Sequence, residues 1–117
     1  MTQRIHAGTR MSQVVIQGDL IFVSGQVADD KQGDIATQTR SVLAKIDRLL
    51  GEAGASRSNL LSVTVLLPNI VDFDAMNAVY DAWIDPKNPP ARACYEARLA
   101  DSNLRIEIVA TAARSSA

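Results

Sequence analysis

The sequence has few of the side chains from which many enzyme sites are built. Its 117 residues include one cysteine, Cys94, and one histidine, His6. A single cysteine excludes an intrachain disulfide and is typical of proteins from reducing compartments, and one His with one Cys is too few for a zinc site within one chain. A Ser-His-Asp triad would have to use His6, which lies in a polar segment where we expect a solvated side chain. Glycine-rich phosphate loops are also missing, so we expect neither a metal ion nor a cofactor.

An excess of charge and long apolar runs are missing too. The net charge is -1 and the basic residues are scattered, so the sequence predicts no basic surface patch that would bind nucleic acid or an anionic membrane. No segment approaches the roughly 20 apolar residues that cross a bilayer, and the polar stretch Thr2–Ser12 lacks the apolar centre of a secretion signal. We therefore expect a cytoplasmic protein without nucleic-acid or membrane partners. Hydrophobic residues at 47% and charged residues at 21% are typical of a folded chain, here one domain over residues 1–117.

Apolar residues recur with a period of two in some segments and with a helical period in others, which predicts five strands and two helices. Asp34 and Gly54 suit the start and the end of the first helix, and Asp72 is expected to cap the second. The second helix is expected to bury Phe73, Met76, Tyr80 and Trp83. The predicted strands are Val14–Gln17, Leu20–Ser24, Leu60–Leu67, Ala91–Leu99 and Leu104–Ala113, and the predicted helices are Asp34–Ala53 and Phe73–Ile84.

The order of these elements, β-β-α-β-α-β-β, predicts an α+β sandwich with both helices on one face of a mixed sheet. Two helices cover only one side of such a sheet. The segments Leu20–Val23 and Val63–Leu67 nevertheless place apolar residues on both sides. An uncovered apolar face predicts that the chain forms an oligomer, although the pattern does not give the number of subunits.

Two polar positions at strand ends are candidates for ligand contact. Ser24 and Gly25 end an apolar strand, where a glycine lets a ligand approach the backbone closely; the alternative is a plain turn. Arg92 begins a strand after a rigid proline loop, and its guanidinium suits a carboxylate bound by two parallel hydrogen bonds. The alternative for Arg92 is a structural salt bridge to Glu96 or Glu107.

Three further residues have both a structural and a functional interpretation. Glu107 lies in the middle of a strand, where a carboxylate is either paired with an arginine or raised in pKa and able to transfer protons. Cys94 shares the strand face of Arg92, and without an adjacent base we expect a small buried side chain rather than a nucleophile. Asn77 lies within the second helix, where the simplest interpretation is a solvent-facing position.

Four segments carry a family resemblance. They are Phe22-Val23-Ser24-Gly25-Gln26, Met76-Asn77-Ala78-Val79-Tyr80, Pro90-Ala91-Arg92-Ala93-Cys94 and Arg105-Ile106-Glu107-Ile108. In this order they resemble the successive motifs of the Rid family, also called YjgF, and the similarity runs from about Ser12 to Arg114. Each motif is weak by itself, whereas four in register are specific.

The resemblance implies a homotrimer with a chorismate-mutase-like fold and active sites in clefts between subunits. The best-studied branch of the family hydrolyses reactive enamines and imines such as 2-aminoacrylate to 2-oxo acids and ammonia, which removes compounds that damage other enzymes. The implied activity is therefore a 2-iminobutanoate/2-iminopropanoate-type deaminase. An iminium carbon is already electrophilic, so an oriented water and a general base are sufficient for this reaction.

The resemblance also assigns roles to the candidate residues. Arg92 would bind the substrate carboxylate, Ser24 and Gly25 would line the pocket, and the backbone near Cys94 would contact the imine nitrogen. Glu107 would position or activate the water. Asn77 matches a motif position and is expected to have a structural role.

One position departs from the family pattern. Met11 stands where the best-studied branch has a pocket tyrosine. A flexible thioether in place of a phenol is expected either to admit a bulkier or more apolar imine or to weaken deamination. A second hypothesis is a trimeric module that binds a 2-oxo acid or another carboxylate without turnover. A third, a ribonuclease or translation inhibitor, is disfavoured by the near-neutral charge.

Overall fold

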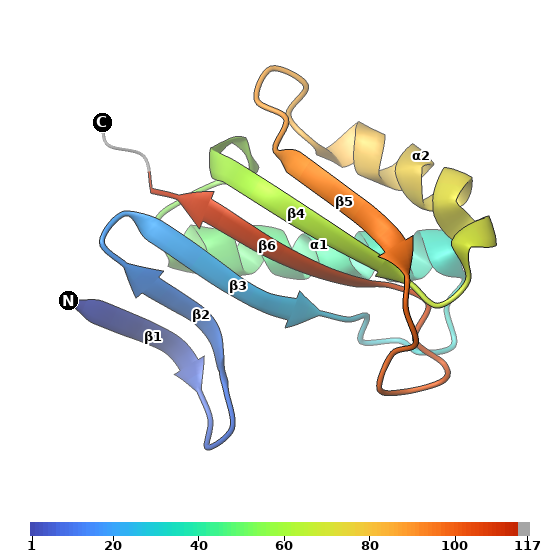
Figure 1. The fold of residues 1–117 in the computed structure, drawn as a ribbon, viewed down its shortest axis with the longest axis horizontal. Helices are drawn as coiled ribbons and strands as arrows, with labels where there is room; N and C mark the ends of the chain where they lie inside the picture. The colour runs from blue at the N-terminus through green and yellow to red at the C-terminus, as the bar shows by residue number, and fades with distance from the viewer. Residues whose placement is uncertain (115–117) are drawn as a thin grey trace.

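Six strands form one mixed sheet in the computed structural model, which describes residues 1–114. The strands lie in the order β1-β2-β3-β6-β4-β5, and of these neighbours only β4 and β5 are parallel. Figure 1 shows α1 crossing behind the sheet and α2 running beside the edge strand β5. The elements are β1 (Thr2–Ala7), β2 (Ser12–Gln17), β3 (Leu20–Gln26), α1 (Ile35–Glu52), β4 (Leu60–Leu67), α2 (Phe73–Trp83), β5 (Ala91–Glu96) and β6 (Glu107–Ala113), with short 3-10 helices at Arg57–Asn59 and Ile70–Asp72.

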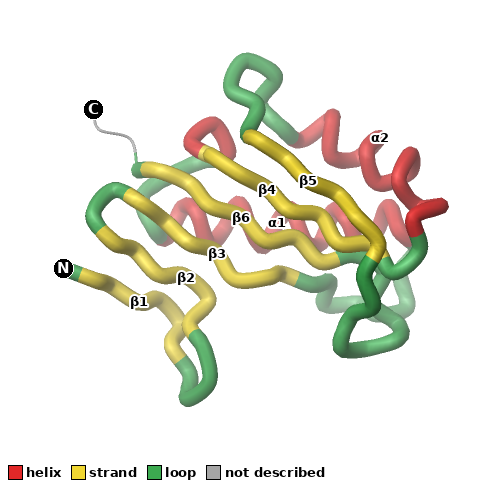
Figure 2. Tube along the Cα trace, viewed as in Figure 1, coloured by secondary structure: helices red, strands yellow, loops and turns green. Residues whose placement is uncertain are grey.

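The predicted α+β class, element order and mixed sheet are confirmed, with one strand added, two strands shortened and two lengthened. β2 begins at Ser12 and β3 runs through Gln26, so Ser24 and Gly25 lie within β3 and not at its end as predicted. β4 has the predicted bounds, whereas β5 ends before residue 97 and β6 begins only at residue 107. The intervening chain forms a long loop, which Figure 2 draws in green between β5 and β6. β1 was missed because all of its residues except Ile5 are exposed; the strand exists through its pairing with β2. Residues 115–117 of the predicted domain lie outside the described residues.

Helix α1 forms as its sequence predicts. The Asp34 carboxylate accepts a hydrogen bond from the backbone N–H of Thr37 at 2.8 Å, and Gly54 follows the helix with a φ of 82°, a conformation that favours glycine. The apolar stripe of α1 is buried against the sheet and supplies a large part of the core. Its buried apolar residues are Ile35, Val42, Leu43, Ile46, Leu49 and Leu50.

Helix α2 departs from the prediction in two respects. Met76 and Tyr80 are buried as expected, but Phe73 is 37% exposed and Trp83 is only half-buried. The helix runs along the sheet edge, where one of its flanks has no neighbouring element (Figure 1). Asp72 occupies the N-cap position without capping the helix, because its carboxylate instead accepts hydrogen bonds from the Arg105 guanidinium at 3.1 and 3.3 Å.

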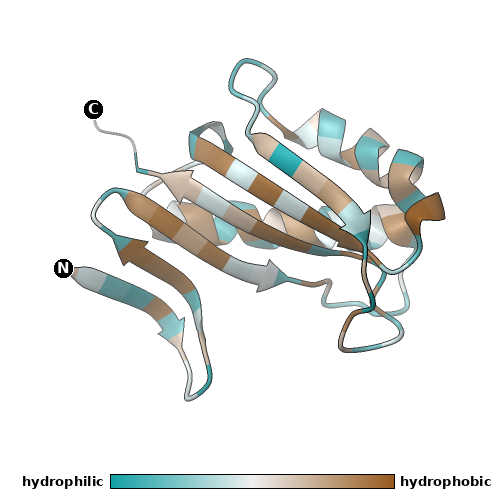
Figure 3. Cartoon of the chain, in the orientation of Figure 1, coloured by the Kyte–Doolittle hydropathy of each residue, from teal (hydrophilic) through white to brown (hydrophobic). Residues whose placement is uncertain are grey.

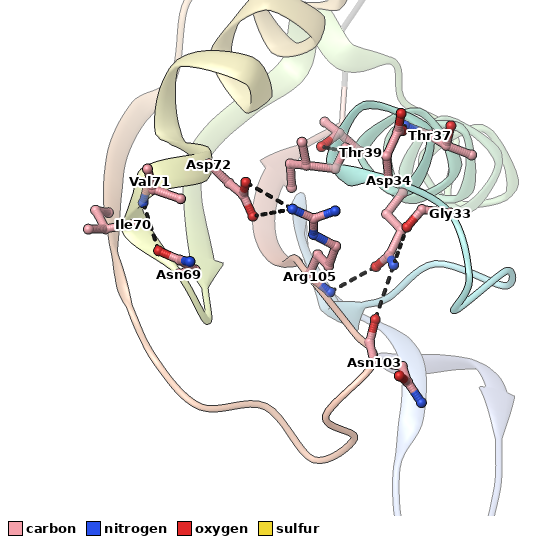
Figure 4. A network of polar contacts seen from close by, with 12 residues as sticks. Gly33, Asp34, Thr37, Thr39, Asn69, Ile70, Val71, Asp72, Asn103 and Arg105 are labelled. Carbon is pink, nitrogen blue, oxygen red and sulfur yellow. Dashed lines mark hydrogen bonds and ion pairs between the residues drawn. The ribbon is translucent and has the colours of Figure 1, made fainter.

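The fully buried Gln38 of α1 fixes the chain that leads into β6. Its Nε2 donates to the carbonyl oxygens of Gly33 and Asn103 at 3.0 and 3.1 Å, and its Oε1 accepts from the backbone N–H of Arg105 at 2.8 Å. Figure 4 shows Arg105 between this cluster and the carboxylate of Asp72. A buried polar group without a partner costs roughly 1–3 kcal/mol, so this network strongly favours one position for the start of β6.

The two faces of the sheet differ in covering. The helix-covered face holds buried side chains such as Ile21 and Val65, whereas Leu20, Phe22 and Val109 on the other face are 42%, 45% and 37% exposed. Figure 3 shows apolar colour along the central strands. We call the uncovered side of the sheet, with Leu20, Phe22 and Val109, the open face. The oligomer that an uncovered apolar face implies stays a prediction. Among residues 1–114, no helix is both long and apolar enough to cross a membrane.

Candidate functional site

Arg92 lies on the helix-covered side of the edge strand β5 and is held by side chains of α2. Its neighbour across the sheet is Val63, and its Nη1 donates to Asn77 Oδ1 at 2.8 Å. The guanidinium carbon lies 4.8 Å from the centre of the Tyr80 ring and 5.9 Å from that of Phe73. Cation–π contacts of this kind orient a guanidinium without neutralising its charge.

No carboxylate of the described chain pairs with Arg92. The alternative of a salt bridge to Glu96 or Glu107 is therefore wrong: Glu96 accepts from the backbone N–H of Ile70 at 3.0 Å, and Glu107 lies on the other face. None of the ion pairs within residues 1–114 includes Arg92. The result is an oriented, unneutralised cation, which is what binding of an external carboxylate requires.

Asn77 and Cys94 complete the surroundings of Arg92. The amide oxygen of Asn77 accepts from the guanidinium, so the solvent-facing interpretation is wrong, and the structural role implied by the resemblance agrees with this contact. Cys94 shares the face of Arg92 as predicted and is half-buried. Burial raises the pKa of the Cys94 thiol, although the charge of Arg92 opposes this shift. A thiol that stays protonated at neutral pH is a poor nucleophile, in agreement with the structural interpretation.

Gly25 lies beneath the carboxylate of Glu107 at an irregularity of the sheet. The register of β3 and β6 shifts between Val23, opposite Ala110, and Gln26, opposite Ile108, which leaves an extra residue on β3. A Cβ atom on Gly25 would lie 2.8 Å from Glu107 Cδ and 3.2 Å from Glu107 Cγ. The side chain of Glu107 therefore occupies the space over the glycine where a Cβ would lie, and ligand contact at Gly25 stays a prediction.

The other predicted pocket residues lie near this bulge. The Ser24 hydroxyl donates to the carbonyl oxygen of Ser12, so Ser24 joins β3 to the start of β2. Met11 directly precedes Ser12 and is 46% exposed. Within the described chain Glu107 has no ion-pair partner, and the predicted alternative of an arginine pair is wrong for a single copy.

The candidate residues thus form two separate groups. The arginine half-site consists of Phe73, Asn77, Tyr80, Arg92 and Cys94. The glutamate half-site consists of Met11, Ser24, Gly25 and Glu107. In the sheet Arg92 lies beside Val63, whose side chain is buried under the helices, whereas Glu107 lies beside Leu66 of the same strand, which faces the opposite side. One chain therefore does not bring Arg92 and Glu107 together.

The contribution of two aromatic residues was missed from the sequence. Phe73 and Tyr80 were assigned to the core, yet both rings lie within cation–π distance of Arg92. Their spacing with Asn77 along α2, four and three residues, places the three side chains on one helix face. That spacing was the available signal, but the strand that this face meets becomes clear only in the fold.

The chain is similar to named proteins over nearly its whole length. The model of the family described as endoribonuclease L-PSP matches residues 1–114. A RutC family protein of Haemophilus ducreyi is 42% identical over 113 residues, which cover 97% of each chain. The RutC family protein YoaB of Escherichia coli is 36% identical over 110 residues, which cover 94% of this chain and 96% of YoaB.

Solved structures show the same fold. A YjgF-family protein from Neisseria meningitidis superposes with a TM-score of 0.97 at 39% identity, covering 100% of this chain and 98% of that one. A member of the YjgF/YER057c/UK114 family from Mycobacterium tuberculosis gives a TM-score of 0.88 at 26% identity, covering 97% and 99% of the two chains. The sandwich of two helices on one mixed sheet is thus shared across distant sequences.

Proposed function

The chain belongs to the YjgF/Rid family, and from that premise we propose that it hydrolyses 2-imino acids to 2-oxo acids and ammonia. The observation that carries the proposal is the guanidinium of Arg92, oriented by Asn77 and Tyr80 and left without a carboxylate partner in the described chain. A 2-imino acid supplies such a carboxylate beside its reactive C=N bond. Binding at Arg92 fixes the position of that bond relative to the protein.

Glu107 supplies the proton transfers in this proposal. A water molecule held by its carboxylate attacks the iminium carbon, and the carboxylate accepts the proton that the water loses. The carboxylic acid of Glu107 returns that proton to the nitrogen of the tetrahedral aminoalcohol, which leaves as ammonia. The hydroxyl oxygen then forms the C=O bond of the 2-oxo acid and releases its own proton to water, which balances the proton that had made the imine an iminium ion. A positioned carboxylate of this kind accelerates such transfers by roughly 10²–10⁴-fold. The overall change is one imine and one water to one oxo acid and one ammonia, so the electrons and atoms balance.

The active site is proposed to form between copies of the chain in a homotrimer. Two observations support this assembly: the arginine and glutamate half-sites lie on opposite sides of the sheet, and the open face exposes Leu20, Phe22 and Val109. Contact between open faces removes apolar surface from water at about 25 cal/mol per Å². A neighbouring copy is then also the source of the group that completes each half-site.

Turnover distinguishes this function from simple carboxylate binding, which uses the same arginine. An amino-acid oxidase generates imines in the presence of semicarbazide, and the purified protein is expected to accelerate imine loss. Arg92→Ala should abolish the acceleration, whereas the matched control Arg40→Ala, an exposed arginine of α1, should retain it. Binding of a 2-oxo acid without turnover by the wild type would overturn the proposal.

The family description also names an endoribonuclease. The net charge of -1 gives little electrostatic attraction for RNA, whose binding normally depends on a basic surface. RNA cleavage that persists through purification and is lost in Glu107→Gln would favour the nuclease over the deaminase.

A further inference from the structure

A polar cleft lies apart from both half-sites, between the N-terminal strands and α1. Its volume is about 340 Å³. Its lining comes from β1, β2, β3 and α1, at the edge of the sheet away from α2 (Figure 1). Its lining residues are His6, Gln13, Gln26, Lys45, Arg48, Leu49 and Glu52. The proposed deaminase reaction uses none of them.

His6 has a strained backbone at the rim of this cleft. Its φ is 53°, in the left-handed region that side chains other than glycine rarely adopt, and the pairing of β1 with β2 skips it. Its Nε2 lies 3.1 and 3.0 Å from the two carboxylate oxygens of Glu52. The imidazole thereby engages the only carboxylate that lines the cleft. Strain of this kind persists where surrounding contacts fix it, and it is concentrated at functional sites.

Arg48 brings to the cleft a positive charge that forms no salt bridge in residues 1–114, although it lies near enough to Asp29 to help lower the pKa of that carboxyl. Among residues 1–114, the guanidinium of Arg48 takes part in no ion pair or side-chain hydrogen bond, whereas Lys45 binds Asp29 at 2.9 Å and the carbonyl oxygen of Val27 at 2.8 Å. The lining holds two cationic side chains, Lys45 and Arg48, and one carboxylate, Glu52, so its charge is positive.

The lining also offers a second hydrogen-bond donor, the amide NH₂ group of Gln13, which Gln26 orients. Gln26 is 4% exposed, and its Nε2 donates to Gln13 Oε1 at 2.8 Å and to the carbonyl oxygen of Ser24 at 3.0 Å. The oxygen of Gln13 accepts this bond, and among residues 1–114 the NH₂ group of Gln13 donates no hydrogen bond, so it can donate to a ligand. A guanidinium and an amide NH₂ together are the donors that an oxyanion requires.

We propose that this cleft is a second binding site, which takes a small oxyanion on Arg48 and the NH₂ group of Gln13. Carboxylate and phosphate share the required chemistry: a negative charge and acceptor oxygens for two donors. Leu49 supplies an apolar wall on one side, which favours a carboxylate with a short hydrocarbon part. The site is independent of Arg92, which lies on the opposite edge strand of the sheet.

The test is a titration of the full-length protein with sodium acetate and, separately, inorganic phosphate at constant ionic strength, followed by ¹⁵N NMR of side chains. Saturable shifts are expected for the Nε–H of Arg48 and the NH₂ of Gln13 with at least one probe. The probe that binds more tightly identifies the class. Arg48→Gln should weaken binding about tenfold or more, since a charge-assisted contact is lost.

Three variants make the result specific. Arg40→Gln removes an arginine of the same helix that does not line the cleft, and it should change the affinity by less than about twofold. Glu52→Gln removes a repulsive charge and should tighten binding. Arg92→Ala should leave it unchanged, whatever its effect on imine hydrolysis. Shifts that fail to saturate with both anions, or that survive in Arg48→Gln, would overturn the proposal.

Discussion

The arginine and glutamate half-sites show two different ways of preparing a charged side chain. Arg92 lies on an edge strand and is oriented by three residues of one helix, at 2.8 Å from Asn77 and beside the rings of Tyr80 and Phe73. Glu107 lies on an inner strand, and its side chain fits there because Gly25 has no side chain to occupy the same space. Both charges lack a partner in the described chain. The comparison supports the proposal that each half-site, incomplete by itself, meets the other half-site on a second copy.

The largest effect is expected from a charge placed on the open face. Phe22→Asp should dissociate the proposed trimer, because a carboxylate would have to be buried without a partner, and imine hydrolysis should fall to the uncatalysed rate. Analytical ultracentrifugation and the semicarbazide assay measure the two effects. Val71→Asp is the control, since Val71 is 75% exposed outside the open face. An active Phe22→Asp monomer would show that one copy suffices.

The second-largest effect on imine hydrolysis is expected when the charge of Glu107 is removed. Glu107→Gln keeps the shape of the side chain but not its basicity, so kcat should fall by roughly 10²–10⁴-fold with little change in KM. The matched control is Glu96→Gln, which retains an acceptor oxygen for the backbone N–H of Ile70. An equal loss in the two variants would contradict the role of Glu107 as base.

Asn77 tests whether the orientation of Arg92 matters. Loss of one hydrogen bond in Asn77→Ala is worth about 1 kcal/mol, so kcat/KM should fall about fivefold, mainly through KM. Asn77→Asp should be more harmful than Asn77→Ala, since the new carboxylate pairs with Arg92 and competes with the substrate. If Asn77→Asp matched the wild type in KM, Arg92 would not be the carboxylate site.

The smallest effect is expected at Cys94. Because burial raises its pKa, its thiolate fraction at pH 7 is lower than that of a free cysteine, and its alkylation by iodoacetamide should become rapid only at higher pH. Cys94→Ala should retain kcat within about threefold, as expected for a residue that offers only its backbone. A loss as large as that of Glu107→Gln would indicate a nucleophilic thiol.

Local patterning was sufficient to predict most of the fold. The alternation in Leu60–Leu67 gave both ends of β4, and Asp34 marked the start of α1 correctly. The N-terminal strand Thr2–Ala7 was missed because it lacks an apolar alternation and depends on its partner strand. Pairing between distant segments is not encoded in a local period.

The site was predictable by residue type but not by arrangement. Arg92, Glu107 and Gly25 were identified from their positions in apolar strands and from family motifs. Their placement on two sides of the sheet follows from the register of β4 with β5 and β6, and the contact of Gly25 with Glu107 follows from a bulge between strands far apart in sequence. The two arrangements depend on which strands pair and in which register, and the pattern of a single sequence does not reveal this.

Complementation between two inactive variants tests the central claim most directly. Arg92→Ala and Glu107→Gln are each expected to be inactive, because every site in either trimer lacks one of the two residues. If each site combines Arg92 of one copy with Glu107 of the next, every mixed trimer has one intact site, and an equal, randomly reassembled mixture should regain about one quarter of wild-type activity. A mixture no more active than its components would contradict a site shared between copies.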